Sequence, residues 1–109
     1  MATGDAPVLE ALIEINAASL ARTELDDRSL MLVRLAALAA VDAPASSYLL
    51  HLRPAVDAGL TAGDAEDVLV AVAPIVGTPR TAAAAAKIVA ALGLAIELAR
   101  EDAESAQGA

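Results

Sequence analysis

The chain has 109 residues, of which 58% are hydrophobic and only 1% aromatic, and its formal net charge is −8. This charge disfavours nucleic acid as a partner, because binding to a phosphate backbone depends on clustered Lys and Arg. The chain contains no cysteine, which excludes disulfides, thiolate metal sites and thiol catalysis by its own side chains. With a single histidine it also cannot form a histidine-rich metal site within one subunit, so we expect neither a metal nor another cofactor.

The mean hydropathy of +0.61 is high for so short a chain, which implies that apolar surface is hidden. A membrane-spanning helix needs about 20 apolar residues with few charges. The apolar runs here are short or are interrupted by Arg34, Lys87 and Glu97. We therefore expect a homo-oligomer that does not associate with membranes. The first residues show no basic region followed by an apolar one, which predicts a cytoplasmic protein without a signal peptide.

No run of residues alternates in the manner of a strand, so the predicted fold class is all-α. A first helix is predicted over residues 7–20, where apolar residues recur at near-helical spacing. A second, over residues 27–41, follows the favourable N-cap Asp26 and is apolar on nearly every face, which is typical of a buried helix. A third, over residues 44–58, contains Pro54, which is expected to bend it one turn earlier.

Turn and capping signals define the remaining two of the five predicted helices. Gly59 is expected to end the third helix with a positive φ. Thr61 and Asp64 form a capping-box pattern at the start of a fourth helix over residues 62–76. The sequence Gly77-Thr78-Pro79 is typical of a helix end followed directly by a new helix start, which predicts a fifth helix over residues 79–103.

Three motifs then follow one another in a characteristic order. The sequence LDDRSL from Leu25 opens a helix, HLR from His51 precedes A-x-x-x-G-L-T, and APIVGTP ends at Pro79. This order resembles the carboxymuconolactone decarboxylase family, which shares its fold with the alkylhydroperoxidase AhpD. The resemblance implies an AhpD-like, all-α subunit that assembles into trimers or hexamers. One domain is expected over residues 1–109, with its core at about 25–98 and flexible ends at 1–6 and 104–109.

The resemblance also bears on the chemistry. AhpD-like members use the pattern C-x-x-C-x-x-x-H, in which His51 matches the histidine while Pro44 and Ser47 occupy the cysteine positions. Neither residue can carry out thiol redox chemistry, which disfavours an AhpD-like peroxidase. A lyase-like activity is what the family otherwise implies.

His51 is the candidate proton-transfer group, with Ser47 one helical turn before it and Tyr48 on the adjacent stripe as further catalytic candidates. Arginines are the candidate carboxylate-binding residues: Arg53, Arg34 and Arg28. The opposing interpretation is a structural histidine that caps or bridges helices, with the Ser47 hydroxyl bonded back to the Ala43 carbonyl. The sequence leaves both interpretations open.

Two functional hypotheses follow. The first is a cofactor-free decarboxylase or isomerase-type enzyme, or a small-molecule binder, that acts on a small organic acid or ketone through His51. The second is a catalytically degenerate oligomer that serves as a binding or scaffold protein. The sequence specifies neither the substrate nor the choice between trimer and hexamer.

Overall fold

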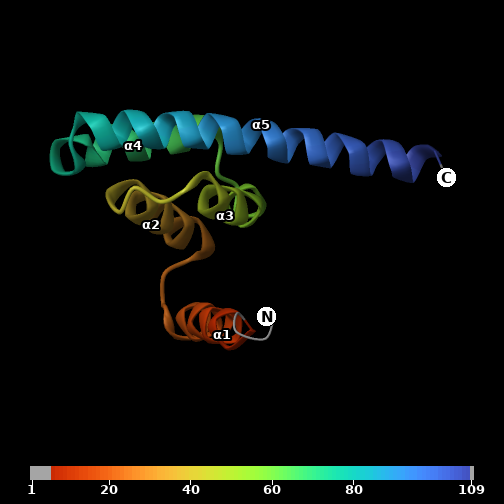
Figure 1. The fold of residues 1–109 in the computed structure, drawn as a ribbon, viewed down its shortest axis with the longest axis horizontal. Helices are drawn as coiled ribbons and strands as arrows, with labels where there is room; N and C mark the ends of the chain where they lie inside the picture. Colours follow the sequence, from red (N-terminus) through yellow and green to blue (C-terminus); the bar gives the residue numbers. More distant parts are fainter. Residues whose placement is uncertain (1–5, 109) are drawn as a thin grey trace.

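The computed structural model describes residues 6–108, and within these the fold is all-α, without a strand. The helices in chain order are α1 (Ala6–Arg22), α2 (Asp27–Ala40), α3 (Ala45–Asp57), α4 (Ala62–Val76) and α5 (Thr78–Gly108). Helices α4 and α5 lie side by side in one layer, and α2 and α3 form a second layer beneath them (Figure 1). Helix α1 lies apart on the far side of the α2–α3 layer.

The helix boundaries follow the local signals in the sequence. The Asp26 carboxylate accepts a hydrogen bond of 2.7 Å from the backbone N–H of Ser29 and caps α2. Thr61 and Asp64 form both bonds of the capping box at the start of α4. Gly59 and Gly77 have φ values of 88° and 94°, a region that favours glycine. These predicted caps and turns are confirmed.

The last helix is longer than predicted. Helix α5 continues to Gly108, so residues 104–108, which were expected to be flexible, are helical. Residues 1–5 and 109, also expected to be flexible, lie outside the described residues. At 31 residues α5 has the length to cross a bilayer, but no described helix combines such length with enough apolar character to do so.

The core lies between the α2–α3 layer and the α4–α5 layer. Its largest fully buried side chain is that of Tyr48, and Leu35 and Ala39 are 2% and 0% exposed. Buried alanines on α3, α4 and α5 let these helices pack closely. Helix α2 buries one face only, since Val33 is 53% exposed. The expectation of burial on nearly every face is therefore wrong for this chain by itself, because no described helix covers the second face of α2 closely.

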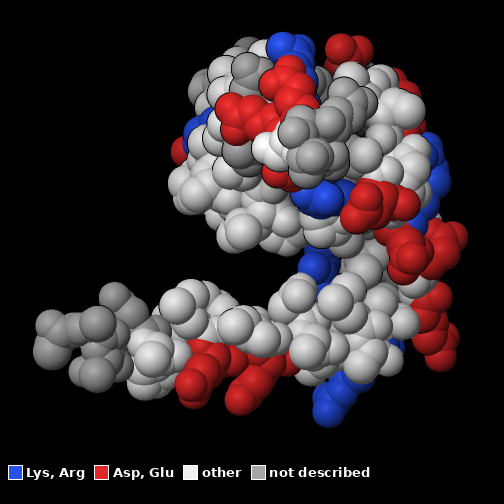
Figure 2. All heavy atoms as spheres, turned by 90° about the vertical axis from the view of Figure 1, so that its right-hand side faces the viewer, with Lys and Arg blue, Asp and Glu red and all other residues white. Residues whose placement is uncertain are grey.

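Helix α1 lies opposite the second face of α2 but does not pack against it. None of its residues is buried, and none of its Cα atoms lies within 8 Å of a Cα atom of another described helix. Its acidic side chains lie on the side turned away from the rest of the molecule, and the side that faces the gap is uncharged (Figure 2). The side chains that line the gap there include Leu9, Leu12 and Ile13. An amphipathic helix thus borders an open hollow with its apolar face.

Candidate functional site

Two adjoining hollows lie between α1 and the α2–α3 layer, with volumes of about 490 and 290 Å³. Both are lined by Leu12, Asn16, Arg34 and His51, so they are parts of one space, which we call the α1 groove. Its size lies within the range of roughly 300–1,000 Å³ that is usual for small-molecule sites.

The walls of the α1 groove are mostly apolar. Helix α1 supplies most of them, α2 supplies Met31 and α3 supplies Leu50 and Pro54. The apolar α1 side chains on the larger hollow are Leu9, Leu12, Ile13 and Leu20. A few polar side chains on apolar walls are typical of sites that orient a small ligand.

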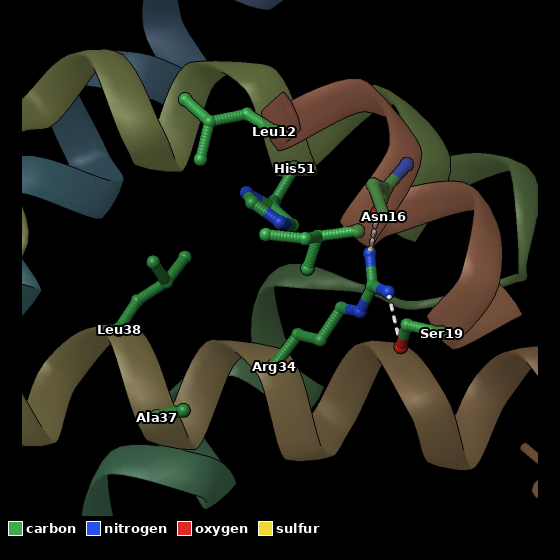
Figure 3. Close-up of a pocket in the computed structure, with 8 residues that line it drawn as sticks. Leu12, Asn16, Ser19, Arg34, Ala37, Leu38 and His51 are labelled. Atoms are coloured by element: carbon green, nitrogen blue, oxygen red, sulfur yellow. Dashed lines mark hydrogen bonds between the residues drawn. The ribbon is translucent and has the colours of Figure 1, made fainter. Parts of the chain in front are cut away.

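Arg34 is the cationic group of the groove. Its Nη1 donates to Asn16 Oδ1 at 2.7 Å and its Nη2 donates to Ser19 Oγ at 3.0 Å (Figure 3). Both acceptors are neutral, and no carboxylate of the described residues forms an ion pair with Arg34. A half-buried arginine without an acidic partner among the described residues is suited to bind the carboxylate of a ligand.

His51 reaches the same groove from α3, and its ring is half-buried. The ring Nδ1 lies 2.8 Å from the backbone oxygen of Ser47, one helical turn earlier. Because a carbonyl only accepts hydrogen bonds, Nδ1 carries the proton when the ring is neutral. Nε2 is then left as a proton acceptor. The groove therefore combines a cation and a base from two different helices (Figure 3).

The other two catalytic candidates, Ser47 and Tyr48, occupy different positions from His51. Ser47 holds the His51 ring through its carbonyl oxygen. Tyr48 is fully buried in the core, does not line the groove, and its hydroxyl has no hydrogen-bond partner among the described residues. Burial raises the pKa of the Tyr48 phenol, and the negative charge of Asp42 adds to this effect.

The bond that the structural interpretation of His51 predicted, from the Ser47 hydroxyl to the Ala43 carbonyl, is not formed among the described residues. Lys87 Nζ donates to that carbonyl instead, at 2.9 Å, and also pairs with Asp42 at the same distance.

Of the three candidate arginines, only Arg34 lines the groove. Arg28 donates to both carboxylate oxygens of Asp64, at 3.0 and 2.7 Å, and its Nη1 also approaches the Gly59 carbonyl at 3.4 Å. Arg53 lies on α3 with an exposed side chain and does not line either hollow.

Sequence reasoning missed Asn16 and Ser19, the two α1 residues that hold the Arg34 guanidinium. They are three residues apart, so they share one face of α1, among the apolar residues that face the groove. The sequence feature that could have identified them is a pair of polar residues at helical spacing within a stripe of apolar residues. No group of three or more metal-ligating side chains occurs in the part of the chain that is described.

The fold and the groove together define a small all-α protein whose candidate site pairs a histidine with an arginine instead of using thiols. Residues 6–91 match the family model for the carboxymuconolactone decarboxylase family, so the chain belongs to this family. The match includes α1, which lies outside the expected core of residues 25–98. No curated protein and no solved structure matches the chain.

Proposed function

We propose that this family member is a cofactor-free enzyme of the decarboxylase or isomerase type that acts on a small organic acid or ketone in the α1 groove. One observation carries the proposal: Arg34, without an acidic partner among the described residues, and His51, with Nε2 left as a base, line the same groove. Arg34 binds the carboxylate or carbonyl of the substrate, and His51 transfers the proton.

Both reaction types use these two groups. In isomerisation of a β,γ-unsaturated ketone, His51 Nε2 removes a proton from the carbon between the carbonyl and the double bond, and the electron pair delocalises onto the carbonyl oxygen. His51 then returns a proton, after exchange with solvent, to the γ carbon as the double bond moves next to the carbonyl. In decarboxylation of a 3-oxo acid, the bond to the carboxyl carbon breaks, carbon dioxide leaves, and the electron pair passes to the ketone. His51, protonated beforehand, then donates its proton to the carbanion carbon.

Hydrogen exchange into the substrate tests the proposal. A panel of 3-oxo acids and lactone acids is incubated with the protein in D₂O, and NMR follows deuterium incorporation and loss of the carboxyl group. We expect catalysed exchange that His51→Gln abolishes and Arg34→Gln weakens by raising KM. Arg53→Gln is the matched control, since this exposed arginine lies on the helix of His51 but outside the groove. Exchange at the full rate in His51→Gln would rule out the proposed role.

The second candidate is a catalytically inactive oligomer that binds or scaffolds other molecules, and one observation favours it. Apolar side chains stand exposed on α4 and α5, with Ile75 at 88%, Val70 at 73% and Val89 at 71%. Exposed apolar surface of this kind is typical of a protein interface. We propose that the chain forms a homo-oligomer under either candidate, and the family suggests a trimer or a hexamer. Sedimentation velocity tests this: Ile75→Glu is expected to shift the mass toward the monomer, and a monomeric parent protein would contradict it.

The thiol peroxidase reaction of AhpD-like proteins is not part of the proposal, because the chain has no cysteine. Peroxide consumption with a thiol reductant is expected to stay at the background rate.

A further inference from the structure

The residues that line the α1 groove indicate the chemical class of the ligand, which membership of the family does not. Away from Arg34 and His51, the larger hollow runs along Leu9, Ile13, Leu50 and Pro54. None of these side chains can donate a hydrogen bond to a second polar group of a ligand. A ligand that lies along them gains by covering apolar surface.

The groove offers one positive side chain that is always charged. Among the residues that the structure describes, Arg34 is the only Lys or Arg that lines either hollow. Arg28 and Lys87 are engaged by Asp64 and Asp42, on other faces of the helices. A ligand with one carboxylate therefore matches the charge of the groove, whereas a second carboxylate along the apolar wall would lose water without gaining a donor.

The Arg34 guanidinium is held in place before a ligand arrives. A guanidinium has five N–H donors, and the structure uses only two of them, toward Asn16 and Ser19. The remaining donors stay available for a carboxylate, and the two bonds reduce the side-chain freedom that binding would otherwise have to remove. Asn16 and Ser19 are thus positioning residues for the anion-binding group.

From these observations we infer that the α1 groove takes a monocarboxylate with an extended apolar body. Its carboxylate binds Arg34 and its body lies along α1 toward Leu50 and Pro54. The inference rests on the proposed function and narrows its substrate class. Mono-acids with longer apolar bodies are preferred over di-acids of equal length.

Two matched ligand series test the preference. The mono-acids are butanoate, hexanoate, octanoate and decanoate, the di-acids are succinate, adipate, suberate and sebacate, and octanol is the uncharged control. His51 is the only histidine, so its ring signals in NMR titrations report on the groove without ambiguity. We expect affinity to rise about two- to fourfold per added methylene in the mono-acids, in line with the burial of apolar surface. Octanoate is expected to bind at least tenfold more tightly than suberate.

Variants separate the head group from the body. Arg34→Gln should remove the preference for octanoate over octanol, and Leu12→Asn should flatten the dependence on chain length. Ser19→Ala should lower the ratio of octanoate to octanol affinity, and Ser19→Thr, which keeps the hydroxyl, should restore it. A merely structural role of Ser19 would weaken both ligands equally, so an unchanged ratio overturns the positioning role.

The possible results distinguish this inference from the proposed function. If di-acids bind as tightly as mono-acids while exchange still depends on His51, the ligand class is wrong and the proposed function stands. If mono-acids bind as inferred but no 3-oxo acid in the panel, apolar-bodied ones included, shows His51-dependent exchange, the proposed function fails and the ligand class stands. Absence of saturable binding for every acid, as when a second copy of the chain covers the groove, overturns both.

Discussion

Arg28 and Asp64, which lie 36 positions apart in the chain, are joined by two parallel hydrogen bonds of 3.0 and 2.7 Å. The pair connects the start of α2 to the start of α4. Asp64 also accepts a bond of 2.8 Å from the backbone N–H of Thr61, so one carboxylate serves both the interhelical contact and the helix cap.

This arrangement makes the stability of the fold depend on pH through Asp64. The hydrogen bonds from Arg28 and then from Thr61 hold the Asp64 pKa well below its ordinary value of 3.8. A carboxyl whose pKa is lower in the folded state stabilises it above the unfolded pKa and loses this effect as the pH falls. We expect Asp64→Asn to lower the free energy of unfolding at neutral pH. The difference in the free energy of unfolding between Asp64→Asn and the parent protein should shrink as the pH falls below about 4.

Urea unfolding at a series of pH values measures this difference. Asp67→Asn is the matched control, because Asp67 is an exposed acid of the same helix and has no side-chain hydrogen bond or ion pair among the described residues. A difference between Asp64→Asn and the parent that is the same at pH 3 and pH 7 would contradict the role given to Asp64.

Arg34 is expected to hold α1 against the body of the protein. Among the described residues, the hydrogen bonds that join α1 to another helix are the two from the Arg34 side chain on α2, and α1 has no buried residue. Arg34→Ala should therefore speed amide hydrogen exchange across Ala6–Arg22 severalfold while leaving exchange in α2 to α4 nearly unchanged. Arg53→Ala should leave the rate of amide hydrogen exchange in α1 unchanged. Equal protection of α1 in both variants would show that its apolar face holds it in place.

The tautomer of His51 is a direct consequence of the Ser47 contact. With Nδ1 2.8 Å from a carbonyl oxygen, the neutral ring should carry its proton on Nδ1 and not on Nε2. The nitrogen-15 shifts of the single imidazole, recorded at alkaline pH, distinguish the two tautomers. Finding the Nε2–H form would mean that the ring does not bond to Ser47 and that Nε2 is not the free base.

Tyr48→Phe is expected to be neutral or to stabilise the fold by up to about 1 kcal/mol. The Tyr48 hydroxyl is buried without a hydrogen-bond partner among the described residues, and such a group costs the free energy of its lost hydration. Thermal and urea unfolding measure the effect, with Leu35→Ala as a core control that should cost about 2–5 kcal/mol. A loss above about 1 kcal/mol in Tyr48→Phe would show that the hydroxyl has a partner.

The sequence predicted the features of the fold that depend on neighbouring residues. Caps such as Asp26 and Thr61, and the glycine ends of α3 and α4, are determined within a few positions, and the structure confirms them. The placement of α1 away from α2 depends on contacts between distant segments, which helical spacing does not encode. The length of α5 was missed because its polar end is compatible both with a tail and with a helix.

The sequence likewise predicted only part of the candidate site. Arg34 and His51 were named from the sequence and line one groove. Arg28 was named beside them, but it pairs with an acid on another helix. Side-chain type and spacing do not reveal which arginine meets an acid from a distant segment, or that Asn16 and Ser19 lie opposite Arg34.

The burial of Tyr48 has a practical consequence for spectroscopy. Tyr48 is the only aromatic residue apart from His51, so all tyrosine fluorescence and most of the near-ultraviolet circular dichroism come from one ring in the core. Those signals report the packing of α3 against its neighbours and are blind to α1, whose helicity appears in the far ultraviolet. If α1 unfolds before the core, the unfolding transition measured in the far ultraviolet will begin before the one measured through Tyr48. If the two transitions coincide, α1 and the core unfold as a single cooperative unit.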